Sequence, residues 1–153
     1  MMMISTKGRY ALRVMADLAR HQGAGYLPLK EIAERQEISE KYLESILKSL
    51  VQAKLLVGIR GKGGGYRLTK APEEYTVGGI LRLTEGDLAP VACLGAGAEP
   101  CPRRERCVTL PLWQKLDGLI QTYLDGVTLA DLMDGAPSAQ GEPGGGEGGQ
   151  GPV

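Results

Sequence analysis

The chain has 153 residues and equal numbers of acidic and basic side chains, 18 of each. This length suits one compact domain with an appendage and excludes two independent enzyme domains. Residues 1–9 hold no apolar stretch of signal-peptide length, and no later run approaches the roughly 18 apolar residues that span a bilayer. We therefore expect a cytoplasmic protein that does not enter the membrane.

The net charge of zero hides an uneven distribution along the chain. Residues 1–72 carry 13 Lys and Arg against 6 Asp and Glu, whereas residues 73–153 carry 5 against 12. A basic front half is typical of a protein that meets a polyanion such as nucleic acid. Solvated surfaces often show a similar asymmetry, so the charge alone leaves both interpretations open.

Apolar periodicity predicts three short helices in the first third of the chain. The first takes Ser5 or Thr6 as its N-cap and ends near Gly23. A second begins around Pro28, because proline suits the first turn of a helix. A third follows Ser39, a good N-cap, and its apolar residues recur on one face while the other face stays polar.

A glycine-rich hairpin is predicted next. Two strand-like runs, residues 55–59 and 66–69, flank the segment Arg60-Gly61-Lys62-Gly63-Gly64-Gly65. The glycines let a backbone approach DNA closely, and Arg60 or Lys62 can neutralise phosphates or enter a narrow minor groove. The alternative is a phosphate-cradling loop of a nucleotide enzyme, but this run neither opens a helix nor ends in Gly-Lys-Ser/Thr.

The next part of the chain is predicted to hold two helices separated by an irregular loop. A short helix fits residues 77–83, and the loop extends from about residue 87 to 108. All three cysteines lie in this loop: Cys93, Cys101 and Cys107. A longer helix follows from Pro111, with Gly126 as a plausible C-cap.

The C-terminal end combines a last turn with a tail of low complexity. Thr128 and Asp131 form a variant of the capping box that opens a final helical turn. From Gly135 onward the sequence has almost nothing to bury, and we expect this tail to be disordered.

The segment from Leu27 to Val51 has the helix, short turn and helix in which the second helix is presented to the major groove. The basic hairpin follows at once, so the sequence predicts a mainly α fold with a small β-hairpin wing, a winged helix-turn-helix. A generic helical hairpin with solvated charges is the alternative. The residues expected to contact DNA are Ser39, Lys41, Tyr42, Glu44, Arg60 and Lys62. Tyr42 has a second interpretation as a core residue.

The helix from Pro111 carries an apolar stripe that needs a hydrophobic surface to cover it. The residues of the stripe are Leu112, Trp113, Leu116, Ile120 and Tyr123. We interpret it as a dimerisation surface, with packing inside one chain as the alternative. The chain thus divides into a DNA-binding region (1–72), the cysteine loop with the dimerisation helices (73–134) and the tail (135–153).

Four stretches of sequence resemble the IscR, NsrR and CymR superfamily of winged-helix transcription regulators over roughly residues 2–134. They are Thr6 to Ala11; Leu29 to Gln36 with Ile38-Ser39 and Tyr42 to Glu44; Arg60-Gly61 with Gly63 to Tyr66; and Cys107 to Thr109 with Leu112-Trp113. The resemblance implies a homodimer whose long helices cross and whose two recognition helices read a palindromic operator in double-stranded DNA. It also implies a repressor of genes for iron–sulfur, redox or cysteine metabolism.

The cysteines number three in a chain without an export signal, which argues against a disulfide framework and for metal or redox chemistry. Their Cys-x7-Cys-x5-Cys spacing resembles the loop of the IscR and NsrR branches, in which three thiolates hold an iron–sulfur cluster. The resemblance therefore assigns Cys93, Cys101 and Cys107 to a cluster, 2Fe-2S in preference to 4Fe-4S. Zinc and metal-free thiols are the alternatives.

The fourth ligand of such a cluster is not identified by the sequence. The IscR branch has a shorter Cys-x5-Cys-x5-Cys spacing and a histidine three residues after the last cysteine, where this chain has Leu110. The NsrR branch uses an aspartate from the first helix of the partner subunit, where this chain has Gly8-Arg9. The remaining candidates are Asp87, Glu99, Glu105, His21 and an exogenous small molecule. His21 is better explained as a solvated helix-end residue, because the C-terminus of a helix favours a partial positive charge.

Two other functions compete with a cluster-sensing regulator. One is a cluster-free regulator like CymR, controlled by a partner metabolic enzyme, with incidental cysteines. The other is a small iron–sulfur electron carrier or oxidoreductase, which leaves the wing and the recognition helix without purpose. The sequence offers no Ser/His/Asp or paired-carboxylate arrangement, so we expect that the protein is not an enzyme.

Overall fold

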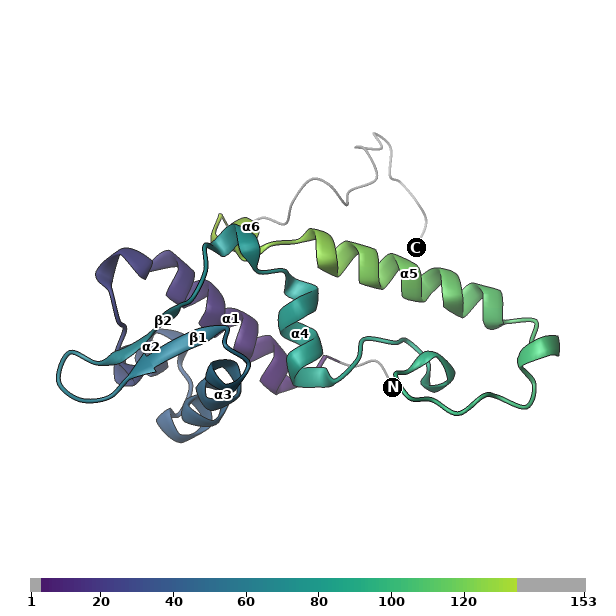
Figure 1. Ribbon diagram of the computed structural model, residues 1–153, viewed down its shortest axis with the longest axis horizontal. Helices are drawn as coiled ribbons and strands as arrows, with labels where there is room; N and C mark the ends of the chain where they lie inside the picture. The colour runs from purple at the N-terminus through teal and green to yellow at the C-terminus, as the bar shows by residue number, and fades with distance from the viewer. Residues whose placement is uncertain (1–3, 135–153) are drawn as a thin grey trace.

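The computed structural model describes residues 4–134, and Figure 1 shows a packed group of helices with a hairpin at one end and a long helix extending from the other. The helices and strands are α1 (Thr6–Arg20), α2 (Leu29–Gln36), α3 (Glu40–Gln52), β1 (Leu56–Ile59), β2 (Gly65–Leu68), α4 (Val77–Glu85), α5 (Leu110–Gly126) and α6 (Leu129–Met133). Four short 3₁₀ turns lie between them: η1 (Gln22–Ala24), η2 (Pro72–Glu74), η3 (Ala92–Leu94) and η4 (Arg104–Arg106). We call α1, α2, α3, α6 and the β1–β2 hairpin the head.

The expected N-caps of α1 and α3 are confirmed. The hydroxyl of Ser5 accepts a hydrogen bond from the backbone N–H of Gly8 at 3.0 Å, and Ser39 does the same for Tyr42 at 3.2 Å. Such caps satisfy backbone donors that the first turn of a helix leaves free. Pro28 is the N-cap of α2, one position earlier than the first turn in which the sequence placed it.

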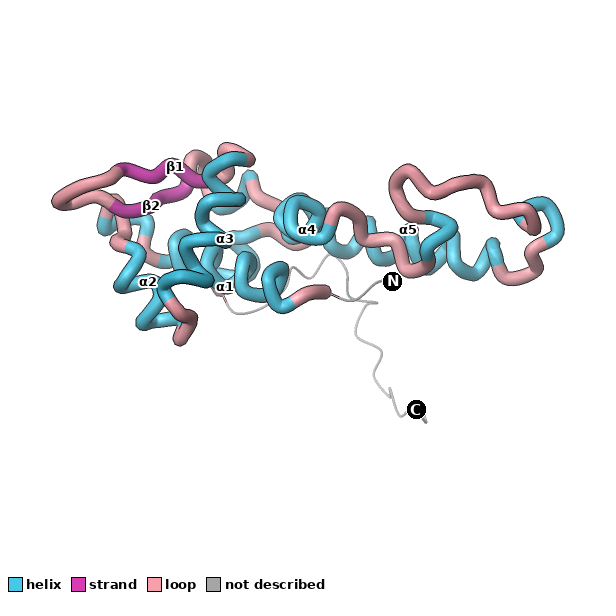
Figure 2. Tube along the Cα trace, turned by 90° about the horizontal axis from the view of Figure 1, so that it is seen from below, coloured by secondary structure: helices cyan, strands magenta, loops and turns pink. Residues whose placement is uncertain are grey.

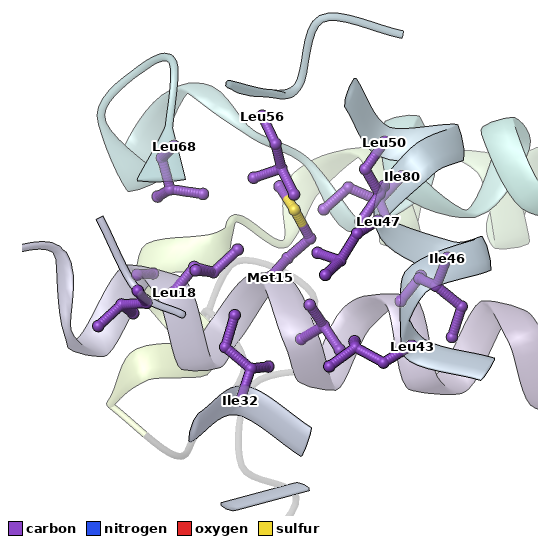
Figure 3. Packing of buried hydrophobic residues seen from close by; sticks show 14 of the residues in the cluster. Met15, Leu18, Ile32, Leu43, Ile46, Leu47, Leu50, Leu56, Leu68 and Ile80 are labelled. Atoms are coloured by element: carbon purple, nitrogen blue, oxygen red, sulfur yellow. The ribbon is translucent and has the colours of Figure 1, made fainter. Parts of the chain in front are cut away.

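The core of the head forms around α1, as Figure 3 shows. Met15 and Leu18 of α1 face Leu43 and Leu47 of α3 and Ile32 of α2, and each of these side chains is at most 1% exposed. Burying an aliphatic side chain of this size contributes roughly 1.5–3 kcal/mol. Later parts of the chain complete the same cluster with Tyr75, Ile80 and Leu129. The three-helix core is therefore closed by α4 and α6 as well.

The hairpin is joined to the head by its own backbone. β1 and β2 pair antiparallel with Gly58 opposite Tyr66, and Leu27 adds a further bridge through two 2.9 Å hydrogen bonds with the backbone of Tyr66. At Gly65 this approach is so close that a Cβ would lie 2.2 Å from the carbonyl oxygen of Leu27. Only glycine fits there, so the position of the hairpin on the head depends on it.

Helix α5 is attached to α4 at its C-terminal end. Ile120 and Leu124 of α5 pack on a small buried cluster of Val77, Leu81, Leu88 and Val127. Arg82 of α4 donates to both carboxylate oxygens of Asp125, at 2.7 and 3.0 Å. The rest of α5 extends away from the head in both views, and none of its residues is buried (Figures 1 and 2).

The predicted elements of the second half are also found. The capping box of α6 is confirmed, since Thr128 N donates to Asp131 at 2.8 Å and Asp131 N donates to the Thr128 hydroxyl at 3.2 Å. Gly126 is the last residue of α5, and Val127 occupies the cap position expected for that glycine. The tail from residue 135 lies outside the described residues. None of the helices in residues 4–134 has the length and apolar character needed to cross a membrane.

Candidate nucleic-acid interface and cysteine loop

The polar face of α3 lies on the surface of the head. Ser39, Lys41 and Glu44 are exposed, and so is Lys48, one turn beyond Glu44. The opposite face of α3 holds Leu43, Ile46, Leu47 and Leu50 in the core. One helix therefore anchors itself with one side and presents hydrogen-bonding and charged groups with the other, as a recognition helix must.

Tyr42 lies at the boundary between these two faces. Its half-buried ring packs on the core of the head and meets the ring of Tyr10 edge to face, with centroids 5.8 Å apart and planes at 74°. The guanidinium of Arg13 lies 4.8 Å from the centroid of Tyr10. Aromatic pairs of this geometry contribute about 0.5–1.5 kcal/mol beyond their burial. Tyr42 thus has a packing role, while part of its side chain stays accessible beside the polar face.

The turn of the hairpin projects two cations on a backbone that only glycines adopt easily. Gly61 and Gly63 have φ values of 96° and 78°, and the Gly64 N–H donates to the Gly61 carbonyl at 3.0 Å. Arg60 and Lys62 are exposed on this turn. The hairpin therefore has the form of a wing with a basic tip.

A groove of about 450 Å³ separates α3 from the wing. Its lining residues are Glu44, Lys48, Val51, Gln52, Gly58, Ile59, Arg60 and Tyr66. Glu44 and Arg60, which the sequence assigned to two separate elements, thus share one surface. Lys48 and Ile59 were not among the expected contacts. Lys48 follows Glu44 at helical spacing and could have been found from it, whereas only the folded hairpin reveals that Ile59 is 48% exposed beside the groove.

An ion pair with a buried carboxylate braces the helix-turn-helix. The carboxylate of Asp17 in α1 is 4% exposed and accepts hydrogen bonds from Arg35 at 2.9 and 2.7 Å and from Gln36 at 3.1 Å. Burial pushes the pKa of Asp17 upward, but the hydrogen bonds and charge of Arg35, with the Gln36 amide, outweigh it and hold the pKa below its ordinary value. In the sequence, Asp17 stands among the apolar positions of α1. A charged residue at such a position is the one signal from which its burial could have been predicted.

His21 is accounted for by the end of α1. It is the C-cap residue, and its Nδ1 lies 2.8 Å from the carbonyl oxygen of Asp17. Figure 1 places this end of α1 and the cysteine loop at opposite ends of the molecule. Within one chain, His21 is therefore far from the thiols for which it was a candidate partner.

The cysteine loop (residues 87–108) leaves α4 and returns to the start of α5. Cys93 lies in η3 and is exposed, Cys101 is exposed, and Cys107 is partly buried just after η4. All three are free thiols. Across residues 4–134, no three His, Cys, Asp or Glu side chains converge as a metal site. The donors suit an iron–sulfur cluster chemically, and the loop has to close before the three sulfurs can share one.

Cys107 is the thiol whose surroundings favour the anion. Its sulfur lies 3.4 Å from the Thr109 hydroxyl, and this hydrogen bond is the main reason why the pKa of Cys107 falls below its ordinary value. Backbone N–H groups and the charge of Arg103 act in the same direction. The thiolate is the form of cysteine that binds metals.

The candidates for a fourth ligand differ in exposure and in the hydrogen bonds that they make. Both carboxylate oxygens of Asp87 accept backbone N–H groups, from Ala89 at 3.0 Å and from Ala96 at 3.1 Å, and these bonds lower the pKa of Asp87. Glu99 and Glu105 are exposed on the loop. Leu110 is the first residue of α5 and has no donor atom to offer.

The apolar residues of α5 divide between two faces. Leu112, Leu116, Leu119 and Tyr123 are 37–59% exposed and recur at helical spacing on one side. On the other side Ile120 packs against α4, and Trp113 is partly buried. Leu119 was not in the expected stripe. The packing of α4 on α5 decides which face of α5 remains exposed, and the spacing of apolar residues alone does not identify that face.

Comparison with protein families and curated proteins gives consistent matches. Residues 4–135 match the model of the Rrf2 family, described as an iron-dependent transcriptional regulator. The chain is 41% identical over 132 residues to the HTH-type transcriptional regulator IscR of Aliivibrio salmonicida, covering 86% of this chain and 77% of that protein. It is 39% identical to IscR of Sodalis glossinidius, covering 86% and 79%.

Solved structures show the same arrangement. CymR of B. subtilis, described as its global cysteine regulator, superposes with a TM-score of 0.72 at 38% identity, covering 89% of this chain and 99% of CymR. IscR of T. potens superposes with a TM-score of 0.69 at 37% identity, covering 88% of each chain. The mainly helical fold with an antiparallel hairpin is therefore shared with winged helix-turn-helix regulators.

Proposed function

The chain belongs to the Rrf2 family of iron-dependent transcriptional regulators, and on this premise we propose that it is a homodimeric repressor whose DNA affinity is set by an iron–sulfur cluster on Cys93, Cys101 and Cys107. The family, the winged helix-turn-helix fold and a DNA-binding regulatory role in place of an enzymatic one were all expected from the sequence and are confirmed. The contacts, the dimer and the cluster are the parts that we propose.

The groove between α3 and the wing carries the DNA-binding proposal. Glu44 of α3 and Arg60 of the wing line it. Ser39 and Lys41 are exposed nearer the start of α3, and Lys62 is exposed on the wing tip. With α3 in the major groove, the wing lies over the neighbouring backbone, where its cations meet phosphates or the narrow minor groove. Tyr42 completes this surface at its edge with the core.

The experiment for this part is selection of binding sites from random duplex DNA, followed by anisotropy titrations at several salt concentrations. We expect a palindromic site bound with a Kd in the range of about 10⁻⁸–10⁻¹¹ M, with an affinity that falls steeply with salt. Lys41→Ala should chiefly change the preferred sequence. Enrichment of no palindrome, with equal affinity for random duplex, would reject sequence-specific recognition.

The exposed face of α5 supports a homodimer. Of the five residues expected there, Leu112, Leu116 and Tyr123 are exposed, Trp113 is partly buried, and Ile120 packs against α4. Leu112, Leu116 and Tyr123 form with Leu119 an exposed apolar stripe along a helix that has no buried residue of its own. A two-fold axis brings the same stripe from a second copy against it, which covers both and sets two α3 helices on one palindromic operator.

The cluster proposal rests on the donor set and the family. Three free thiols lie on one loop between α4 and α5, and Cys107 favours the thiolate. A 2Fe-2S cluster would supply a thiolate-ligated iron centre that assembles or is lost with iron, sulfide and oxidants. In this chain, the loop would close to bring the sulfurs together beside α5, the proposed dimer helix. The alignment of the two heads, and so the DNA affinity, would then depend on the loop.

Anaerobic purification with an absorption spectrum and counts of iron and sulfide tests the cluster. We expect a coloured protein with visible thiolate-to-iron absorption and two irons per chain in the 2Fe-2S form. Replacing all three cysteines by serine should remove the colour without unfolding the head, because none of them contributes to its core.

A second candidate is a cluster-free regulator under the control of a partner metabolic enzyme. It is favoured by one observation, that the ligand-type side chains of residues 4–134 do not converge on a metal site. Three results would establish it in place of the cluster sensor. The anaerobic protein would be colourless, and its operator affinity would change when a purified metabolic enzyme is added. The triple serine variant would have the same operator affinity as wild type.

A further inference from the structure

Asp87 stands at the root of the cysteine loop and has no part in the DNA interface. Its Oδ1 accepts the backbone N–H of Ala89 at 3.0 Å, and its Oδ2 accepts that of Ala96 at 3.1 Å. The second bond spans nine residues of sequence. It closes the segment from Asp87 to Ala96 into a small ring with Cys93 in the turn between them.

The root of this ring is fixed to the body of the protein. Leu88 and Ala89, next to Asp87, are 2% and 8% exposed, and Leu88 packs in the cluster that holds α4 to α5. A Cβ on Gly95 would lie only 3.2 Å from Asp87 Oδ2, so the carboxylate lies directly against the backbone beyond η3. Asp87 therefore connects a buried anchor to the far side of the Cys93 turn.

The second half of the loop is held differently. In the part of the chain that the structure describes, residues 97–106 make only short-range backbone bonds, such as Arg104 N to the Cys101 carbonyl at 3.0 Å and Arg106 N to the Arg103 carbonyl at 3.0 Å. Those bonds shape single turns and do not connect them to a helix. Cys93 is therefore on a clamped segment, and Cys101 is on one that can move relative to it.

We propose that Asp87 is a positioning residue for the metal site: it holds Cys93 in place as the fixed sulfur on which Cys101 and Cys107 close. This inference rests on the proposed function, in that it takes the three cysteines as ligands. It also assigns both carboxylate oxygens of Asp87 to backbone N–H groups in place of a metal ion. A group that orients a ligand in this way typically changes metal affinity by about 10–100-fold.

Amide exchange in the metal-free protein tests the clamp itself. Asp87→Ala should speed exchange of the Ala96 amide by roughly tenfold, since its acceptor is gone, and Asp87→Asn should fall between, because one oxygen remains. Glu99→Ala is the matched control, since it removes an exposed carboxylate from the same loop. An unchanged Ala96 exchange rate in Asp87→Ala would overturn the proposal.

Anaerobic titration with Co²⁺ tests the role toward the metal, with the thiolate-to-cobalt absorption as readout. We expect Asp87→Ala to bind Co²⁺ about 10–100-fold more weakly than wild type, with the same spectrum at saturation and the same urea unfolding midpoint. A changed spectrum at saturation would make Asp87 a ligand, and an unchanged affinity would leave it without a role. Either result rejects the positioning role of Asp87 and leaves the cysteine site intact. Wild-type protein without a thiolate band would reject the cysteine site and this role together.

Discussion

The head and helix α5 treat their apolar side chains in opposite ways. In the head, Val14, Met15 and Leu43 are fully buried, whereas in α5 the side chains of Leu112 and Leu119 are 59% and 56% exposed. Exposed apolar residues that recur along one stripe usually mark an interaction surface. The comparison shows that the core of the head is complete within one chain, while α5 has an apolar surface that a second chain can complete.

The polar groups of the two regions differ as well. The head buries the carboxylate of Asp17, and its ion pair with the more exposed Arg35 joins two helices. The cysteine loop instead keeps its charged groups at the surface, and Asp87 accepts hydrogen bonds from backbone N–H groups of the same loop. Within residues 4–134, every buried side-chain nitrogen and oxygen has a hydrogen-bond partner. The polar groups of the head thus connect separate helices, whereas those of Asp87 connect residues of the same loop.

The largest effect is expected from breaking the ion pair of the head. Arg35→Ala leaves the buried carboxylate of Asp17 without its cation, which should lower the free energy of unfolding by about 3 kcal/mol. Urea unfolding followed by circular dichroism measures it. Lys30→Ala, an exposed cation on the same helix, is the control and should change the stability by less than about 0.5 kcal/mol. Equal values for the two variants would show that the pair does not brace the head.

A charge on the exposed face of α5 should act on assembly and spare the head. Leu116→Asp places a carboxylate in the proposed dimer interface and should weaken the dimer about 100-fold, or about 2.7 kcal/mol. Sedimentation velocity over a range of concentrations measures this. Gln114→Asp, at an exposed position on the opposite side of α5 from the apolar stripe, should leave the dimer intact. Dimers of unchanged strength in Leu116→Asp would place the interface elsewhere.

The wing should affect DNA binding without affecting either stability or assembly. Arg60→Ala removes a cation from the edge of the groove and should weaken operator binding about tenfold, or about 1.4 kcal/mol. The slope of log affinity against log salt concentration should fall by about 1, the value for one lost phosphate contact. Anisotropy titrations at several salt concentrations measure both. Lys115→Ala removes the same charge from α5 and should leave both values unchanged. A loss of affinity common to the two variants would indicate only a dependence on net charge.

Acid should reduce the contribution of the head's ion pair. The folded pKa of Asp17 lies below its ordinary value of 3.8, so its carboxylate stabilises the fold above that pH and loses this effect as the pH falls through the folded pKa. The stability difference between wild type and Asp17→Asn should therefore be constant near neutral pH and shrink below about pH 4. Urea unfolding at a series of pH values gives the difference. A gap that widens in acid would contradict a lowered pKa.

The sequence predicted those features that depend on local chemistry. The Ser5 and Ser39 caps and the Thr128–Asp131 box are each set by residues three apart, so their pattern was sufficient. The pairing of Asp17 with Arg35 and the packing of Ile120 against α4 depend on how helices meet, which periodicity does not encode. Asp87 was recognised as a candidate ligand, but its bond to Ala96 exists only once the loop has folded.

The dependence of DNA affinity on the three cysteines is tested most directly by one comparison of operator binding under anaerobic conditions. Wild-type protein and the variant with Cys93, Cys101 and Cys107 replaced by serine are each titrated onto the selected palindrome, before and after treatment with iron and sulfide. We expect the treatment to change the wild-type Kd at least about tenfold, equivalent to about 1.4 kcal/mol, and to leave the serine variant unchanged. An equal change in both proteins, or none in wild type, would contradict regulation through these thiols.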